Sequence, residues 1–132
     1  MERIDVIKEA KRVFDIEIAA LEKTRDALDG EFEEILKAVI SCAGKVIITG
    51  MGKPGHIGEK LAATFSSLGT PSFFLHPAEA MHGDLGMVSK DDVVIAISFS
   101  GESDEIVKIL PTIKLIGAKL IGITGNPNST LA

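Results

Sequence analysis

The stretch from Val93 to Ile106, VVIAISFSGESDEI, constrains the fold of this chain more than any other part of its sequence. It opens with a continuous apolar run, which is typical of a strand buried on both faces of a parallel sheet. A serine loop, Ser98–Ser103, follows at once, and a helical pattern begins directly after it. The stretch therefore predicts a strand, a tight loop and a helix, the repeating unit of α/β proteins.

The serine loop has the composition of an anion site. Ser98, Ser100 and Ser103 can each donate a hydrogen bond, and Gly101 lets the backbone approach a ligand closely. The N-terminus of the following helix adds partial positive charge. One of these serines could instead serve only as a helix N-cap. Because a single cap does not explain all these hydroxyls, the loop favours phosphate binding.

Strands and helices alternate along the rest of the chain. Apolar runs predict further strands at residues 45–49, 72–75 and 119–124, and helical spacing predicts helices at 31–43, 57–68 and 106–116, with a kink at Pro111. Gly44, Gly69 and Gly117 fit as helix stops. A last helix is expected to open after Gly125. The apolar residues expected on the buried face of the helix at 31–43 are Phe32, Ile35, Leu36, Val39 and Ile40.

A long amphipathic helix is expected from Ile4 to Leu28, ahead of the α/β core. It carries one apolar stripe that includes Phe14 and Leu21, and a second that includes Val13 and Ile16. Two adjacent stripes predict a contact with another subunit, although one broad face turned toward the core of the chain itself fits the pattern equally well.

A glycine loop, Gly50–His56, follows the first predicted strand of the core. Gly50 and Gly52 allow the tight turn that cradles phosphate, but the spacing fits neither a Walker loop nor a dinucleotide site. Lys53 could hold a phosphate or polarise a carbonyl oxygen. It could equally be a solvated surface lysine.

Two histidines and two carboxylates follow the second predicted strand, in the segment HPAEAMHGD. Histidine suits proton transfer near neutral pH. His82, beside a flexible glycine, is the better catalytic candidate. His76 alone is a weak metal ligand, and a hydrogen-bonded loop histidine is the simpler interpretation.

Parallel strands place their carboxyl ends at one edge of the sheet, where ligands of open α/β sheets bind. We therefore expect Gly52, His82, Ser100 and Asn126 to line one crevice that takes a phosphorylated small molecule. The formal charge of −5 and the scarcity of aromatic residues argue against nucleic acid as a partner. No apolar run is long enough for a membrane span and no signal-peptide core is present, so a cytoplasmic protein is expected.

The segments GMGKPGHIG, GTPSFFLHPAEAMHGDLGMV, VIAISFSGES and GITGNPNSTLA resemble the sugar-isomerase (SIS) domain, and most closely its arabinose-5-phosphate isomerase branch. The resemblance implies a flavodoxin-like fold: a three-layer α/β sandwich with a parallel sheet, behind a long N-terminal helix. It implies one SIS domain over residues 1–132, with the helix at 1–30 and the sheet core at 31–132. It also implies a homo-oligomer, a dimer or tetramer, whose subunits complete one another's sites.

The same resemblance assigns residues to roles. It implies a catalytic set of Lys53, His82 and Glu105, and a substrate contact at Gly69 and Thr70. It associates His76 with a divalent metal, and implies no other cofactor. The phosphate would lie on the serine loop, through Ser98, Ser100, Gly101 and Ser103, beside Gly50 and Gly52 of the glycine loop.

Two departures from the family pattern stand out. The first loop of the family normally reads Gly-Lys-Ser-Gly, whereas Pro54 here removes both a hydroxyl and an N–H, so weaker or reoriented phosphate binding is expected. The family also places a catalytic glutamate and histidine, and often tandem regulatory domains, downstream of the position of Ala132. The sequence is therefore expected to lack the C-terminal part of the fold.

The leading hypothesis is an aldose–ketose isomerase that converts D-arabinose 5-phosphate to D-ribulose 5-phosphate through an enediol. By resemblance, Glu105 would be the base, His82 would assist ring opening or shuttle protons, and Lys53 would stabilise the oxyanion. Glu102 would only complement the helix dipole. A non-catalytic phosphosugar-binding module is the alternative. The sensing domain of a transcriptional regulator is a weaker third hypothesis, because no DNA-reading helix precedes the core.

Overall fold

The computed structural model describes residues 5–132 of the chain. These residues fall into two compact units, residues 5–34 and 35–132, and helix α2 (Gly30–Ile40) has residues in both. The units are described one at a time. Within residues 5–132, no helix has the length and apolar character needed to cross a bilayer.

The first unit is dominated by helix α1 (Val6–Asp26), which confirms the predicted long N-terminal helix. Ile4, where the predicted helix begins, lies outside the described residues. Asp5 caps the helix, since its carboxylate accepts a hydrogen bond of 3.1 Å from the backbone N–H of Lys8. Within the described part of its own unit α1 has no layer to pack against, and none of its residues is buried. The predicted subunit contact on this helix stays a prediction.

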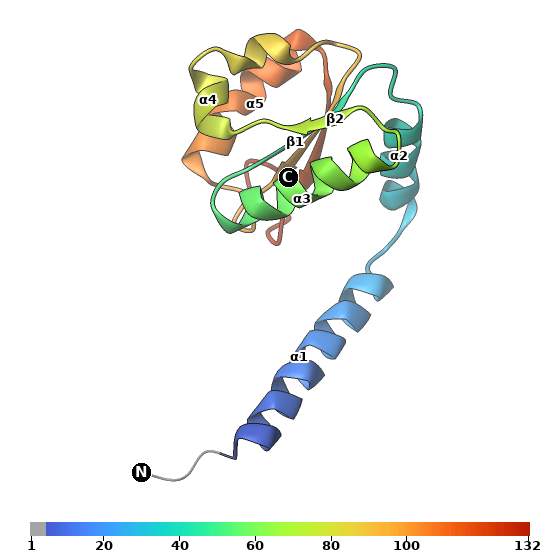
Figure 1. Ribbon diagram of the computed structural model, residues 1–132, viewed down its shortest axis with the longest axis vertical. Coiled ribbons are helices and arrows are strands. Elements are labelled where there is room, and N and C mark those ends of the chain that lie inside the picture. Colours follow the sequence, from blue (N-terminus) through green and yellow to red (C-terminus); the bar gives the residue numbers. More distant parts are fainter. Residues whose placement is uncertain (1–4) are drawn as a thin grey trace. The chain divides into compact units, whose positions relative to one another are not determined.

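The second unit is built around a four-stranded parallel sheet, as predicted. Its strands are β1 (Val46–Gly50), β2 (Ser72–Phe74), β3 (Val93–Ile97) and β4 (Lys119–Ile123), and they lie in the order β2-β1-β3-β4. Figure 1 labels β1 and β2. β1 and β3 pair along their whole length, from Val46 opposite Val93 to Gly50 opposite Ile97. The central strands are buried on both faces, which explains their continuous apolar sequences.

Helices cover both faces of this sheet and give the predicted three layers. α2 and α3 (Lys53–Ser67) pack on one face, over a core that includes Ala38, Ile48 and Ala62. α4 (Pro77–Met81) and α5 (Asp104–Ile116) pack on the other face, together with Ile47 and Ile109. A short 3-10 helix, η1 (Asp84–Met87), follows α4. Alternate β1 side chains point to opposite faces, so one strand supplies both cores.

The prediction for the helix at 31–43 was wrong in two respects. Helix α2 ends at Ile40, and Leu36 and Ile40 are 48% and 75% exposed. The burial expected of Phe32, which belongs to the first unit, stays a prediction. Only Ala38 is fully buried, with Ile35 and Val39 packed beside it. The apolar stripe of α2 therefore extends around the helix beyond the residues that pack against the core.

Gly44 is not the helix stop that the sequence suggested. Its backbone N–H donates to the carbonyl oxygen of Asp91 at 2.9 Å, and an added Cβ would lie 2.2 Å from a carboxylate oxygen of Asp92. Glycine is required at this position because the start of β3 approaches the backbone closely.

The helix expected after Gly125 does not form. The residues after β4 make turns, in which the Asn126 side chain accepts from the N–H of Asn128 at 3.0 Å and the Ser129 hydroxyl donates to the Asn126 carbonyl at 2.8 Å. Such local bonds compete with helix formation. Helix α5 ends as predicted at Gly117, which adopts a φ of 88°. Pro111 lies inside this helix, and the kink expected there stays a prediction.

The strand order determines where a ligand site can form. All four strands are parallel, so their carboxyl ends share one edge. The chain leaves β1 toward β2 on one side, and β3 leads to β4 on the other, so the connections diverge between β1 and β3. Ligands of open α/β sheets bind at this kind of switch point. The glycine loop and the serine loop follow the two strands that flank it.

Candidate functional site

The glycine loop brings the start of a helix directly against the end of β1. Gly52 adopts a φ of 66°, a conformation that favours glycine, and helix α3 begins with the next residue. At Gly55, an added Cβ would lie 2.8 Å from the Gly50 carbonyl oxygen, so a larger residue there would separate helix and strand. The helix therefore starts at Lys53, four residues before the predicted position at Ile57.

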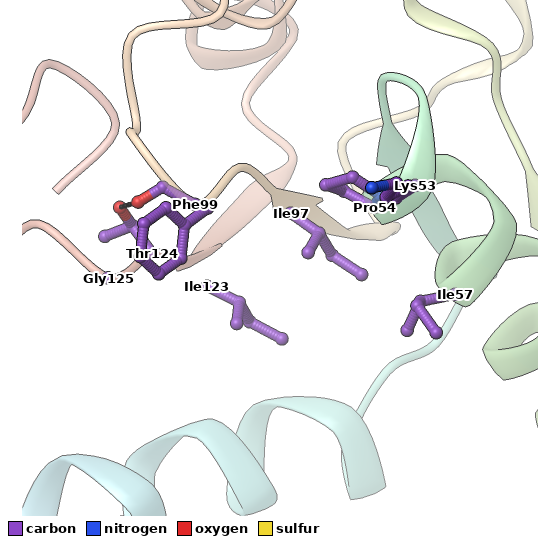
Figure 2. Close-up of a pocket in the computed structure, with 8 residues that line it drawn as sticks. All are labelled: Lys53, Pro54, Ile57, Ile97, Phe99, Ile123, Thr124 and Gly125. Atoms are coloured by element: carbon purple, nitrogen blue, oxygen red, sulfur yellow. Dashed lines mark hydrogen bonds between the residues drawn. The ribbon is translucent and has the colours of Figure 1, made fainter. Parts of the chain in front are cut away.

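Lys53 is exposed and lies on the wall of a cavity of about 420 Å³, here called the wide cavity. Figure 2 shows Lys53 and Pro54 on one side of it, Phe99 and Thr124 on the other, and Ile97 between them. Most of this lining is apolar, and among the described residues that form it the Lys53 ammonium is the one cationic group. The remaining lining residues are Ile57, Ile123 and Gly125.

The serine loop has a defined shape without any ligand. The Ser98 hydroxyl lies 2.9 Å from the Ser103 hydroxyl and accepts a hydrogen bond of 3.2 Å from the backbone N–H of Gly101. Ser98 is only 2% exposed, whereas Ser100 is exposed and accepts from the N–H of Glu102 at 3.2 Å. Ser98 therefore shapes the loop, and Ser100 is the hydroxyl that a ligand can reach.

Ser103 occupies the N-cap position of α5, yet its side chain makes no capping hydrogen bond. The simple interpretation of the loop, in which a serine only caps the helix, therefore does not describe this residue. The uncapped N–H groups at the start of α5 stay available to an acceptor, as at other anion sites.

The two glutamates after the loop differ in their contacts. Glu105 lies half-buried in the first turn of α5, and within residues 5–132 its carboxylate makes no hydrogen bond or ion pair. Glu102 is bound at both oxygens: one accepts from the backbone N–H of Thr130 at 2.6 Å and the other from the Thr130 hydroxyl at 2.8 Å. These bonds, the backbone one first, lower the pKa of Glu102. Sequence reasoning missed this contact.

His76 caps helix α4, and its Nδ1 accepts a hydrogen bond of 3.2 Å from the N–H of Ala78. The hydrogen-bonded loop histidine of the simpler interpretation is thus present. Its ring also lies edge-on to Phe74, with 6.3 Å between centroids. His76 lines a second cavity of about 220 Å³, here called the narrow cavity, which also contains Gly50, Gly52 and Gly55 of the glycine loop.

Three further polar residues near this edge were missed at the sequence level. His56 and Glu59 line the narrow cavity, with 3.6 Å between Nδ1 and a carboxylate oxygen. Their spacing of three on one helix was the available signal. Thr49, directly before the glycine loop, is fully buried, and its hydroxyl has no hydrogen-bond partner in the described part of the chain. Nothing in the local sequence indicated this.

Not all expected site residues come together in one chain. His82 is an exposed C-cap of α4 and lines neither cavity. Gly69 and Thr70 precede β2, so they lie at the sheet edge opposite the two loops. Of the four residues expected in one crevice, Gly52 lines the narrow cavity, and Ser100 and Asn126 adjoin Phe99 and Gly125 of the wide cavity.

The association of His76 with a divalent metal stays a prediction. Between residues 5 and 132, no group of three or more His, Cys, Asp and Glu side chains is placed to hold a metal ion. His76 could offer one imidazole nitrogen, because Nδ1 already accepts from Ala78. A single nitrogen is too few ligands for a stable divalent site.

Curated relatives match most of this chain. It is similar to arabinose 5-phosphate isomerase KpsF of Escherichia coli, at 54% identity over 115 residues, which are 86% of this chain and 35% of the relative. It is also similar to arabinose 5-phosphate isomerase KdsD of Pseudomonas aeruginosa, at 48% identity over 131 residues, 99% of this chain and 40% of the relative. The chain therefore spans well under half the length of these relatives.

Solved structures and the family comparison agree with these relatives. A structure of an Escherichia coli CFT073 protein in complex with arabinose 5-phosphate superposes with a TM-score of 0.90 at 51% identity, covering 100% of this chain and 70% of that one. The SIS domain family matches residues 39–132, which contain both loops, both cavities and the whole sheet. With this match and these relatives, the chain belongs to the SIS domain family.

Proposed function

We propose that this chain carries the sugar-phosphate site of an aldose–ketose isomerase, which interconverts D-arabinose 5-phosphate and D-ribulose 5-phosphate. One observation carries the proposal: Lys53 and Phe99 of the serine loop lie on opposite sides of the wide cavity, at the switch point of the sheet. The names of the curated relatives and the ligand of the related structure support the choice of sugar.

The phosphate group would lie on the serine loop. Ser100 and the free N–H groups at the start of α5 supply donors there, and Gly101 allows close approach. Gly50 and Gly52 border the same edge from the glycine loop. Since the formal charge of the chain is −5, attraction of a phosphate must come from these local groups.

The reaction moves one proton between neighbouring carbons. Glu105 would take the proton from C2 of the open-chain aldose, the C–H electron pair would form a C1–C2 double bond, and the carbonyl pair would move onto O1. Lys53 would stabilise the resulting enediolate, the step in which preorganised charge contributes most. The proton on the C2 hydroxyl then moves to O1, the C2–O bond becomes the carbonyl, and the C1–C2 pair takes the proton back from Glu105 at C1, so the ketose forms with no atoms gained or lost.

A homo-oligomer, dimer or tetramer, would complete the site. Gly69 and Thr70 lie at the opposite edge of the sheet, and His82 lies outside both cavities. If these residues touch the sugar, as the resemblance to the family implies, they must come from a neighbouring copy of the chain. In that role His82 would assist ring opening.

The proposed reaction needs no cofactor, because proton transfer and charge stabilisation suffice. A divalent metal at His76 would require ligands beyond those that residues 5–132 place there, so no step is assigned to it. The partner is a phosphorylated sugar and not nucleic acid or a membrane surface. We place the protein in the cytoplasm, where Cys42, its only cysteine, would stay reduced.

An isomerase assay with arabinose 5-phosphate, run beside a calorimetric titration with the same sugar, tests the proposal on the full 132-residue chain. Lys53→Ala should lower turnover by about 100-fold to 1,000-fold, as loss of an oxyanion-stabilising group typically does, while the Kd changes little. Lys60→Ala is the matched control, because Lys60 is an exposed lysine of the same helix that lines neither cavity.

The alternative is a phosphosugar-binding module without turnover. The displaced positions of His82, Gly69 and Thr70 favour it for an isolated chain. Tight binding of arabinose 5-phosphate by the wild-type chain with no ketose formed, at any protein concentration, would support the binding module and contradict the isomerase.

A further inference from the structure

Glu102 joins two segments that are far apart in the sequence. Its two carboxylate oxygens accept the backbone N–H and the hydroxyl of Thr130, at 2.6 and 2.8 Å, across 28 positions of the chain. Thr130 therefore binds both oxygens of the carboxylate. A carboxylate held in this way is turned toward Thr130 and is not presented to an incoming ligand.

The residues on either side of Thr130 hold the serine loop as well. The backbone N–H of Leu131 donates to the Gly101 carbonyl at 3.1 Å, and Leu131 is 8% exposed in a small core with Ile106. Ser129 is buried against Gly101, so closely that an added Cβ on the glycine would lie 2.0 Å from the serine hydroxyl. The centre of the serine loop is thus held from outside the loop.

The beginning of the loop is held by the same segment. The Thr124 hydroxyl and the N–H of Gly125 both donate to the Phe99 carbonyl, at 3.2 and 3.0 Å. Phe99 and Gly101 are therefore both fixed by residues that follow β4. Within the described part of the chain, Glu102 is the one side chain of the serine loop that reaches back to that segment and binds it at two atoms.

We propose that Glu102 is a positioning residue, which keeps the serine loop in its anion-binding shape by clamping Thr130. The inference rests on the proposed function, because it concerns affinity for the phosphate of the substrate. The clamp predicts the opposite effect on phosphate affinity from charge repulsion alone. A carboxylate beside a phosphate should weaken binding by repulsion, whereas a clamp should strengthen it.

The substitutions Glu102→Ala and Glu102→Gln separate the clamp from the charge. Alanine removes both contacts with Thr130, and phosphate affinity should fall by about tenfold, which is typical when a group that orients a binding residue is lost. Glutamine keeps the shape and can still accept the Thr130 N–H while its amide donates to the hydroxyl, so affinity should match or exceed that of the wild type. If Glu102 acts only through its charge, both variants should bind more tightly.

The matched control is Asp104→Asn. Asp104 lies two residues away in the first turn of α5 and is exposed, and its one ion pair among residues 5–132 is with Lys108, at 3.8 Å. The variant removes one negative charge near the same helix start without touching Thr130. Its phosphate affinity should be unchanged or slightly higher. A loss equal to that of Glu102→Ala would overturn the proposal, because a variant that leaves the contact with Thr130 intact would then weaken binding as much as one that removes it.

The contact itself is tested by pairing Glu102→Ala with Thr130→Val, which removes the hydroxyl and keeps the backbone N–H. Each single variant should weaken binding, and the double variant should be no weaker than Glu102→Ala, because both act through one contact. Additive losses would overturn the proposal. In the isomerase assay, Glu102→Ala should raise KM with kcat within about twofold, as expected when binding but not chemistry is affected.

The probes are inorganic phosphate and arabinose 5-phosphate, titrated into the full chain by calorimetry. A wild-type chain that binds neither probe would refute the proposed function and this inference together. A wild-type chain that binds both, with Glu102→Ala binding equally well, would refute the clamp alone. A Glu102→Gln variant as weak as Glu102→Ala would also refute it, because glutamine keeps the shape of the side chain and can still bind Thr130 at two atoms.

Discussion

The hydroxyl of Ser98 lies 2.9 Å from the hydroxyl of Ser103, so the two ends of the serine loop are joined directly. The same Ser98 hydroxyl also accepts the N–H of Gly101 at the centre of the loop. One buried side chain thus closes a loop of six residues at two points. A loop closed in this way is organised before its ligand arrives, which reduces the entropy lost on binding.

Ser98→Ala and Ser100→Ala should have different effects. Ser98→Ala removes two internal contacts of a buried hydroxyl and should lower the free energy of unfolding by about 1–2 kcal/mol, together with phosphate affinity. Ser100→Ala should weaken phosphate binding and leave unfolding within about 0.5 kcal/mol of wild type, because Ser100 is exposed. Urea unfolding and a phosphate titration measure both quantities. Equal stability losses would contradict this division of roles.

The sheet and its two loops could be predicted because their signals are local. The apolar runs of β1 and β3 follow from burial on both faces, and the parallel order brings the loops that follow them to one edge. Lys53 next to the serine-loop edge follows from this topology alone. The sequence was informative wherever a residue's role depends on its immediate neighbours.

The contacts of the segment after β4 could not be predicted, because they depend on partners far along the chain. Asn126 and Ser129 show a pattern that can open a helix, but hydrogen bonds within the turn, and those of Thr130 and Leu131 with the serine loop, decide the conformation of the segment. Glu102 looked like a residue that only balances a helix dipole, and its bonds with Thr130 are invisible in either segment alone. Gly44 was misjudged for the same reason, since its close neighbour is Asp92.

Asp92 should be a main determinant of stability at the edge opposite the site. Its buried carboxylate accepts the N–H groups of Lys45 and Ser89, each at 2.7 Å, and joins the starts of β1 and β3. Asp92→Ala leaves both donors without this acceptor and should lower the free energy of unfolding by about 3 kcal/mol. Asp91→Asn, at the exposed neighbouring residue, is the control and should change it by less than about 0.5 kcal/mol.

The effect of Asp92→Ala should depend on pH. Burial raises the pKa of Asp92, but hydrogen bonds from Lys45 and Ser89 and the charge of Lys45 outweigh it, so the pKa lies below its ordinary value of 3.8. A depressed pKa stabilises the fold above the unfolded-state value, and this contribution is lost as the pH falls through the folded-state value. Urea unfolding at several pH values should show wild type and variant converging below pH 3.8. A constant difference down to the acid limit would refute this assignment.

Gly101→Ala should be more damaging than Gly52→Ala. Both glycines have positive φ values, 68° and 66°, so alanine costs about 1–2 kcal/mol of backbone strain at either position. Only at Gly101 does the new Cβ meet another atom, the Ser129 hydroxyl at 2.0 Å, whereas no described atom lies within 4 Å at Gly52. Overpacking should add about 1–3 kcal/mol there. Equal losses in the free energy of unfolding of the two variants would show that segment 124–132 moves aside for the added Cβ at no measurable cost.

Pro54→Ser should increase phosphate affinity. Pro54 lies in the first turn of α3 beside Lys53, where proline fits the helix but supplies neither an N–H nor a hydroxyl to the site. Serine restores both, and Pro54→Ala restores the N–H alone, so the pair separates the two contributions. Each added donor should tighten binding by about threefold to tenfold, the effect of a net hydrogen bond of roughly 0.5–1.5 kcal/mol. Loss of proline rigidity should cost about 0.4–1 kcal/mol of stability in both variants. A phosphate titration in which neither variant binds more tightly would show that the start of α3 does not face the phosphate, and the serine loop would then hold it alone.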